Sequence, residues 1–213
     1  MKRFVALSCG LAAVVVAQAA EASATRVYAF QALLDGKPIG EHRFTVETDG
    51  STRLVSSEAD FKVTLLGFTA YRYHHHAQEQ WAGDCLVSLT SSTDDDGKAA
   101  NVRLAKVGEV DEITTATGQG SVPGCLMTYA YWNPAMRSQT RLLNPQTGKV
   151  DVVKVERVGS GRIAVHGVDV DAVDWRVTGG ESPVDVWVTS SGEWVGLDSM
   201  VSKGKRKLSY RLP

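Results

Sequence analysis

The sequence lacks the short motifs by which a single chain most often identifies an enzyme. It contains no G-x-x-x-x-G-K-[ST] loop, no G-x-G-x-x-G, no H-E-x-x-H and no G-x-S-x-G elbow. The nearest approach to the elbow, Gly118–Ser121, lies in a polar, glycine-rich stretch. Asp169, Asp171 and Asp174 follow the alternation of a strand, where solvated faces carry such residues routinely. We therefore predict no catalytic residue and no cofactor.

Neither sign of charge is in excess. The chain has 23 Lys and Arg side chains against 24 Asp and Glu, a formal net charge of −1. Nucleic acids and anionic membrane surfaces select for basic patches, so we predict neither as a partner. The one basic cluster, Lys203–Lys207, lies between two strand-like segments, where a solvated hairpin tip fits better than a phosphate site.

Long apolar runs are also missing, apart from Phe4–Val16, which is shorter than the roughly 20 residues of a membrane-spanning helix. Two basic residues precede this run and two A-x-A patterns follow it, ending at Ala19 and Ala24. This order is typical of a secretory signal peptide. We predict a signal peptide over residues 1–24, a single β-rich domain over 25–213, no membrane span, and a periplasmic or secreted location.

Cysteine is scarce. Of the three cysteines, Cys9 falls within the signal peptide, because the residues before it do not fit a lipoprotein signal. The remaining pair, Cys85 and Cys125, predicts one disulfide in an oxidising compartment, with two separately buried thiols as the alternative. Closing a loop of about 40 residues would stabilise the fold by roughly 3 to 4 kcal/mol in the chain-entropy model.

Residues of alternating character fill most of the remaining chain. The two-residue period of strands runs through about a dozen segments separated by Gly, Pro and Asp turns. A sheet of that length must curl or close to protect its edges. We predict a curved antiparallel sheet that closes into a barrel or half barrel, with strands near 26–34, 42–46, 53–63, 69–81, 85–92, 99–107, 149–157, 162–165, 168–178, 184–189, 194–201 and 207–212.

Two segments interrupt this pattern. Apolar residues cover most of Gly124–Pro134 and continue to Met136, so we predict one short central helix there, starting near Pro123 and covered by the sheet. The polar segment Asp111–Ser121 is rich in threonine and glycine, and we predict that it is mostly loop.

The run His74–His76 suggests a metal site, but a strand directs neighbouring side chains to opposite faces. Only His74 and His76 share a side, while His75 shares the face of Tyr73 and Glu79. A zinc site with His42, His74 and His76 is therefore a weaker reading than structural or surface histidines, since a further ligand is missing. Asp94–Gly97 lacks the spacing of a calcium loop and fits a hairpin turn.

Aromatic residues are the remaining candidates for a binding site. A curved sheet has a concave face, and a concave face lined by aromatic rings can hold an apolar molecule. The alternative is that the same rings fill a packed core. As ligand-binding candidates we name Tyr71, Tyr73, Tyr129, Trp132 and Trp187.

Three segments of the sequence resemble those of a known family: Leu34–Phe44, Gly124–Pro134 and Gly192–Leu197. They resemble secreted proteobacterial proteins grouped as a domain of unknown function, which are similar to periplasmic β-proteins of the lipoprotein-carrier kind. The resemblance implies the fold and supplies no catalytic residues. We expect a periplasmic binding or chaperone-like protein holding an apolar, lipid or acyl ligand, with no protein partner identified. The alternatives are an interaction protein with a filled core and a histidine-dependent enzyme.

Overall fold

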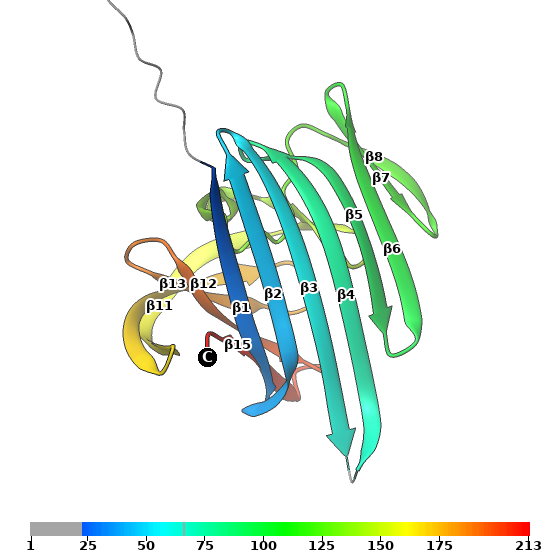
Figure 1. Ribbon diagram of the computed structural model, residues 1–213. Coiled ribbons are helices and arrows are strands. Elements are labelled where there is room, and N and C mark those ends of the chain that lie inside the picture. The colour runs from blue at the N-terminus through cyan, green and yellow to red at the C-terminus, as the bar shows by residue number, and fades with distance from the viewer. Residues whose placement is uncertain (1–22, 66) are drawn as a thin grey trace, which may run out of the picture.

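The computed structural model describes residues 23–65 and 67–213, so residues 1–22 of the predicted signal peptide lie outside it. Thirteen strands form one antiparallel sheet in the order β11-β12-β13-β14-β15-β1-β2-β3-β4-β5-β6-β7-β8 (Figure 1). Their bounds are β1 Ala24–Leu34, β2 Lys37–Asp49, β3 Thr52–Leu65, β4 Phe68–Ala82, β5 Cys85–Asp95, β6 Lys98–Val107, β7 Val110–Thr115, β8 Gly118–Pro123, β11 Lys154–Val165, β12 Val168–Thr178, β13 Val184–Thr189, β14 Trp194–Val201 and β15 Arg206–Arg211.

The alternation of the sequence sets which face of each strand is buried. In β1, every second residue from Tyr28 to Leu34 points into the core, and the residues between them are more exposed. The turn that follows has positive φ at both Asp35 and Gly36, which is the geometry that matches the twist of a two-residue hairpin. The prediction of a mainly antiparallel β fold is confirmed, with most strand ends shifted by a few residues. The predicted strands 149–157 and 162–165 are wrong in extent, because residues 150–152 form a separate short strand and Lys154–Val165 is one continuous strand, β11.

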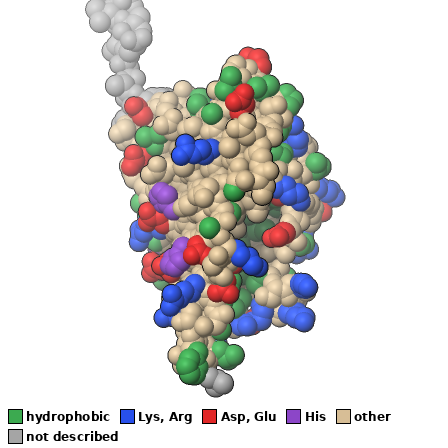
Figure 2. Space-filling view, turned by 90° about the vertical axis from the view of Figure 1, so that its right-hand side faces the viewer, with side chains coloured by type: hydrophobic (Ala, Val, Ile, Leu, Met, Phe, Trp, Pro, Cys, Tyr) green, Lys and Arg blue, Asp and Glu red, His purple; other side chains and the backbone are tan. Residues whose placement is uncertain are grey.

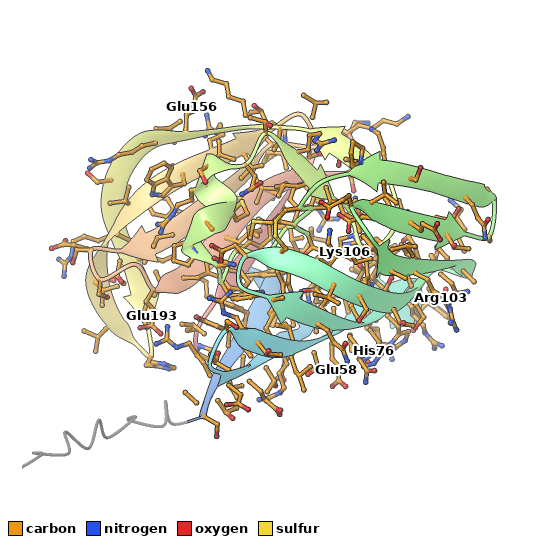
Figure 3. The ribbon with its side chains drawn as sticks, turned by 90° about the horizontal axis from the view of Figure 1, so that it is seen from above. Glu58, His76, Arg103, Lys106, Glu156 and Glu193 are labelled. Atoms are coloured by element: carbon orange, nitrogen blue, oxygen red, sulfur yellow. A yellow bond between two sulfur atoms is a disulfide. The ribbon has the colours of Figure 1, made fainter. Side chains whose placement is uncertain are left out.

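The sheet curls but does not close. Its edges are β8 and β11, and no ladder joins them in the described residues. Seen from above, the strands surround an interior that residues 124–153 enter (Figure 3). A separate ribbon of β9 Arg141–Leu143 and β10 Val150–Val152 belongs to that segment. Of the two predicted forms, a barrel or a half barrel, the closed barrel is therefore wrong.

The predicted central helix is also wrong. Residues 124–133 are extended or turn, and the helical element that follows is η1 Pro134–Ser138, a five-residue 3₁₀ helix. The backbone of residues 124–133 makes bonds to residues distant in sequence: Leu86 N–H donates to Leu126 C=O at 3.0 Å, and Leu143 N–H donates to Met127 C=O at 2.8 Å. Its internal bonds, such as Asn133 N–H to Ala130 C=O at 2.8 Å, close tight turns and not α-helical turns. A buried apolar run has the same composition in either conformation, so its pattern alone does not identify a helix.

The inner segment is nevertheless buried by the sheet, as predicted. Leu126, Met127 and Ala130 are at most 2 % exposed and belong to the main core cluster. The buried carboxylate of Asp111 accepts a hydrogen bond from Leu126 N–H at 3.2 Å. A disulfide joins Cys85 to Cys125, which confirms the predicted pairing and attaches the start of the segment to β5.

The assignment of residues 111–121 to loop was wrong. They form most of the β7–β8 hairpin at one edge of the sheet. Asp111 and Ile113 point inward while Glu112 is exposed, so β7 keeps the two-residue period. The threonines that made the segment look polar are good strand formers, and an edge strand tolerates the glycines of β8.

Candidate functional site

The interior contains a cavity of about 260 Å³. One wall is formed by the inward faces of β2, β3 and β4, and the opposite wall by residues of β13, β14 and β15. Residues 128–132 of the inner segment lie against it, and residues 144–146 and 180–182 complete the lining. The cavity exists because the inner segment fills most, but not all, of the hollow that the sheet encloses.

Two of the five predicted ligand-binding residues line this cavity. Trp132 is half-buried and packs edge-on against Trp81, with ring centroids 5.4 Å apart, and the Arg53 guanidinium lies 5.6 Å from its ring. Tyr129 donates a hydrogen bond from its hydroxyl to Asp151 Oδ2 at 2.8 Å. Both rings are therefore held in place by contacts outside the cavity, which leaves their other surfaces free to contact a ligand.

The other three predicted residues lie elsewhere. Tyr73 is buried and stacks on Phe61 at 5.3 Å, while Tyr71 donates to Asp95 Oδ1 at 2.7 Å. Trp187 packs on a second, smaller core cluster and donates from Nε1 to Asp198 Oδ2 at 3.1 Å. These aromatic residues therefore stabilise the fold, which is the alternative considered for all of them.

The histidines divide between the two faces of the sheet as the strand period predicts. His74 Nδ1 lies 3.3 Å from Asp60 Oδ2, and His76 Nδ1 lies 3.6 Å from a Glu58 oxygen, all on the outer face. Figure 3 shows Glu58 and His76 on the outside of the sheet, and Figure 2 shows histidine and acidic side chains gathered on that side. His42 is inside, so the three candidate metal ligands are not brought together.

No group of three or more metal-ligating side chains occurs in the described part of the chain. The outer histidines do border a depression of about 600 Å³ on the surface over β2 to β6. Its volume is larger than that of the interior cavity, but its charged walls are exposed to solvent on the face of the sheet. We therefore take the interior cavity, whose lining includes the buried side chains His42, Ser57, His75 and Glu79, as the candidate site.

His42 lies at the centre of a buried hydrogen-bonded chain. Its Nε2 is 2.8 Å from Ser57 Oγ and its Nδ1 is 3.0 Å from the Tyr210 hydroxyl. Burial lowers the pKa of His42 to about 3, so the ring is neutral at physiological pH. A serine beside a histidine resembles a nucleophile and its base, but so low a pKa makes the imidazole a weak proton acceptor. The arrangement is better suited to hydrogen bonding than to proton transfer.

Two further ionisable groups face the same cavity. His75 Nδ1 is 2.9 Å from Thr93 Oγ1, and burial lowers the pKa of His75 to about 4. Glu79 accepts a hydrogen bond from Trp81 Nε1 at 2.9 Å, and burial raises the pKa of Glu79 to about 7. Both shifts favour the uncharged form, because the interior solvates charge poorly.

The sequence reading missed most of the cavity lining. It placed His75 and Glu79 on one face but did not select them, and it did not single out Ser57 or Tyr210. One signal was available in the sequence. Every second residue from Tyr73 to Trp81 points inward, and this inward-pointing row begins and ends with an aromatic residue. Polar residues within such an apolar alternation are buried, and buried polar residues need partners.

A family model described as Domain of unknown function (DUF6134) matches residues 30–212, so the chain belongs to that family. No curated protein matches it in sequence. A crystal structure described as a β-barrel-like protein of domain of unknown function DUF1849, from Brucella abortus, is similar with a TM-score of 0.57. The similarity covers 89 % of this chain and 94 % of that chain at 8 % identity, which shows the fold alone. The resemblance to lipoprotein carriers stays a prediction.

Proposed function

We propose that this member of the DUF6134 family binds a small apolar or acyl molecule in the cavity between its curved sheet and its inner segment. The observation that carries the proposal is the set of aromatic side chains that line the cavity while only partly buried, Phe44, Tyr129, Tyr131 and Trp132. Aromatic rings that border open space inside a protein are typical of sites for apolar ligands.

The size of the cavity limits the ligand. About 260 Å³ corresponds to roughly nine water-sized groups at ~30 Å³ each. This is below the roughly 300 to 1,000 Å³ of most drug-sized sites. A chain of about eight carbons fits this volume, whereas a complete two-chain lipid would leave most of its acyl atoms outside.

The affinity should be moderate. Burying eight methylene groups contributes roughly 6 kcal/mol at ~0.8 kcal/mol per group. Part of this is offset by the lost freedom of the ligand. A dissociation constant of 1 μM corresponds to about 8 kcal/mol, so we expect a weaker, micromolar to millimolar complex. That range suits a protein that exchanges its ligand readily.

We place this activity in the periplasm or outside the cell. The predicted signal peptide, residues 1–24, supports export. The bridge between Cys85 and Cys125 fits an oxidising compartment, because cytosolic thiols are kept reduced. In the described residues, no helix has the length and apolar character needed to cross a bilayer.

Tryptophan fluorescence tests the proposal directly. We expect eight-carbon amphiphiles to change the emission of the protein, and Trp132→Phe to remove most of that change because Trp132 lines the cavity. Trp175→Phe is the matched control: its ring lies 5.4 Å from the Arg137 guanidinium and is not part of the lining. The control should retain the signal.

A second variant tests the proposal by filling the cavity, without removing any side chain that would contact the ligand. Ala77 lines the cavity and is 1 % exposed, so Ala77→Leu places new atoms where the ligand would lie. We expect it to abolish binding while the fold persists, at an overpacking cost of about 1 to 3 kcal/mol. Absence of any emission or thermal shift with apolar ligands in the wild-type protein would overturn the proposal in favour of a filled-core interaction protein.

A further inference from the structure

We propose, resting on the function proposed above, that the cavity selects molecules whose polar end is uncharged, such as an alcohol, ester or amide, over carboxylates and phosphates. The inference comes from how polar and apolar side chains divide between the two walls of the cavity, and from the absence of Lys and Arg among its described lining residues.

The polar side chains lie on one wall in adjacent rows of the sheet. The register pairs His42 with Ala59 and Ala59 with His75, which places both histidines in one inward row. The next row contains Ser57, which pairs with Ala77, and the row after that contains Glu79. His42, Ser57, His75 and Glu79 all line the cavity, so the β2–β4 wall presents a compact group of hydrogen-bonding atoms.

The opposite wall is more apolar. Its lining from β13, β14 and β15 consists of Val184, Leu197, Val201 and Leu208 with Ser199 and Tyr210, and the Tyr210 hydroxyl is already bonded to His42 of the first wall. A ligand that satisfies both walls must therefore have an apolar part and a hydrogen-bonding part. An alkane would displace water without offering a partner to the polar atoms that the protein leaves free, such as His75 Nε2.

The charge of the lining disfavours anions. Its acidic members are Glu79 and the exposed Glu181, and it contains no lysine or arginine in the residues the structure describes. His42 and His75 are neutral near pH 7, since burial lowers the pKa of each to about 3 and about 4. A carboxylate or phosphate would lose its hydration without gaining a cation as partner.

Uncharged head groups avoid this cost and still find partners. The Ser57 and Tyr210 hydroxyls can each donate or accept, and both are positioned through His42. His75 uses Nδ1 for Thr93, and its Nε2 makes no hydrogen bond to any described residue. A hydroxyl or amide can therefore bond to this wall whichever tautomer the histidines adopt.

A series of ligands with one chain length and different head groups tests the inference. We would measure the binding of octanol, octanamide, octanoate, octyl phosphate and octylamine to the mature chain at pH 7.5 by calorimetry. We expect octanol and octanamide to bind at least tenfold more tightly than octanoate and octyl phosphate. Octanoate should bind more tightly as the pH is lowered and its carboxylate becomes protonated.

The outcomes separate the two proposals. If no member of the series binds, the proposed function fails together with the selectivity. If octanoate or octyl phosphate binds as tightly as octanol, the function stands and the selectivity is wrong. If octylamine binds most tightly, the site recognises a cation through Glu79, which also overturns the inference.

A serine pair provides the matched variants. Ser57 points inward and lines the cavity, whereas its neighbour on β3, Ser56, points to the other face of the sheet and is not part of the lining. Ser57→Ala should weaken octanol binding about three- to tenfold, the effect of one hydrogen bond. Ser56→Ala should leave octanol binding unchanged. The ligand series on the wild-type chain does not depend on either variant folding.

Discussion

The two faces of β4, Phe68–Ala82, carry similar residue types in different environments. On the outer face, His74 and His76 are exposed and lie beside Asp60 and Glu58. On the inner face, His75 is 5 % exposed and Glu79 is 8 % exposed. A shift of one residue along the strand thus moves a histidine from a solvated position beside a carboxylate to a position in the cavity wall.

The difference teaches that chemistry in this fold follows side-chain direction more than residue type. Exposed ion pairs are screened by water and salt, and each contributes at most about 1 kcal/mol. Inside the sheet, burial shifts the pKa of His75 and of Glu79 in the direction that favours the uncharged form. Substitutions on the inner face should therefore change stability and its pH dependence, and equivalent substitutions on the outer face should not.

The largest contrast should come from Trp81 and Gln80. Trp81 is 1 % exposed, packs against Trp132 and donates to Glu79, so Trp81→Ala should lower the free energy of unfolding by about 3 to 5 kcal/mol. Gln80→Ala, one residue away on the outer face, should change it by less than about 0.5 kcal/mol. Urea unfolding measures both, and equal losses would contradict the comparison.

The second contrast is between Glu79 and Glu58 as the pH rises from about 4.5 to about 7. Burial raises the pKa of Glu79 from 4.5 to about 7, so between these values the folded state binds more protons than the unfolded state. The free energy of unfolding should therefore fall as pH rises through this window, by about 3 kcal/mol in total.

Glu79→Gln removes this ionisable group and should abolish the fall. Compared with the wild type, the variant should therefore be more stable at pH 8 than it is at pH 5. Glu58→Gln is the control, since Glu58 lies on the outer face beside His76 and should leave the fall intact. Urea unfolding at a series of pH values measures the profile. A Glu79→Gln profile parallel to that of the wild type would show that Glu79 does not cause it.

The smallest contrast is between His75 and His76 in acid. Burial lowers the pKa of His75 from 6.5 to about 4, so the unfolded state binds more protons in this window and stability falls as pH decreases through it. His75→Gln should reduce this acid-induced loss of unfolding free energy by about 2 kcal/mol. The effect is smaller than the full pKa shift would give, because the ring borders the cavity and is not fully enclosed by protein. His76→Gln should change the loss by less than about 0.5 kcal/mol. The reverse order would contradict the assigned faces.

Much of the fold could be predicted because strands and hairpins depend on local pattern. The alternation in β1 and β4, and the turn at Asp35 and Gly36, specify which side chains are buried and where the chain reverses. The disulfide between Cys85 and Cys125 was predictable from scarcity, since these are the two cysteines that lie outside the predicted signal peptide. The predicted helix failed because its backbone partners, such as Leu86 and Leu143, are distant in sequence.

The candidate site was less predictable than the fold. All five candidates were selected because they are aromatic, and two of them, Tyr129 and Trp132, do line the cavity. Tyr71 and Trp187 were selected by residue type alone, and their hydrogen bonds to Asp95 and Asp198 place them elsewhere. The type of residue indicates that an aromatic ring will be at least partly buried. It does not indicate whether the ring lines the cavity or packs elsewhere in the fold.

The sequence by itself determined the strand-rich class, the inward and outward faces and the single cysteine pair, because each depends on period or count. Only the tertiary structure decided that the sheet stays open, that the inner segment lacks an α-helix, and that His42 hydrogen-bonds to both Ser57 and Tyr210. The last contact joins residues 168 positions apart. Contacts between residues so distant in sequence depend on how the long sheet curves around the inner segment, and no local sequence pattern encodes that curvature.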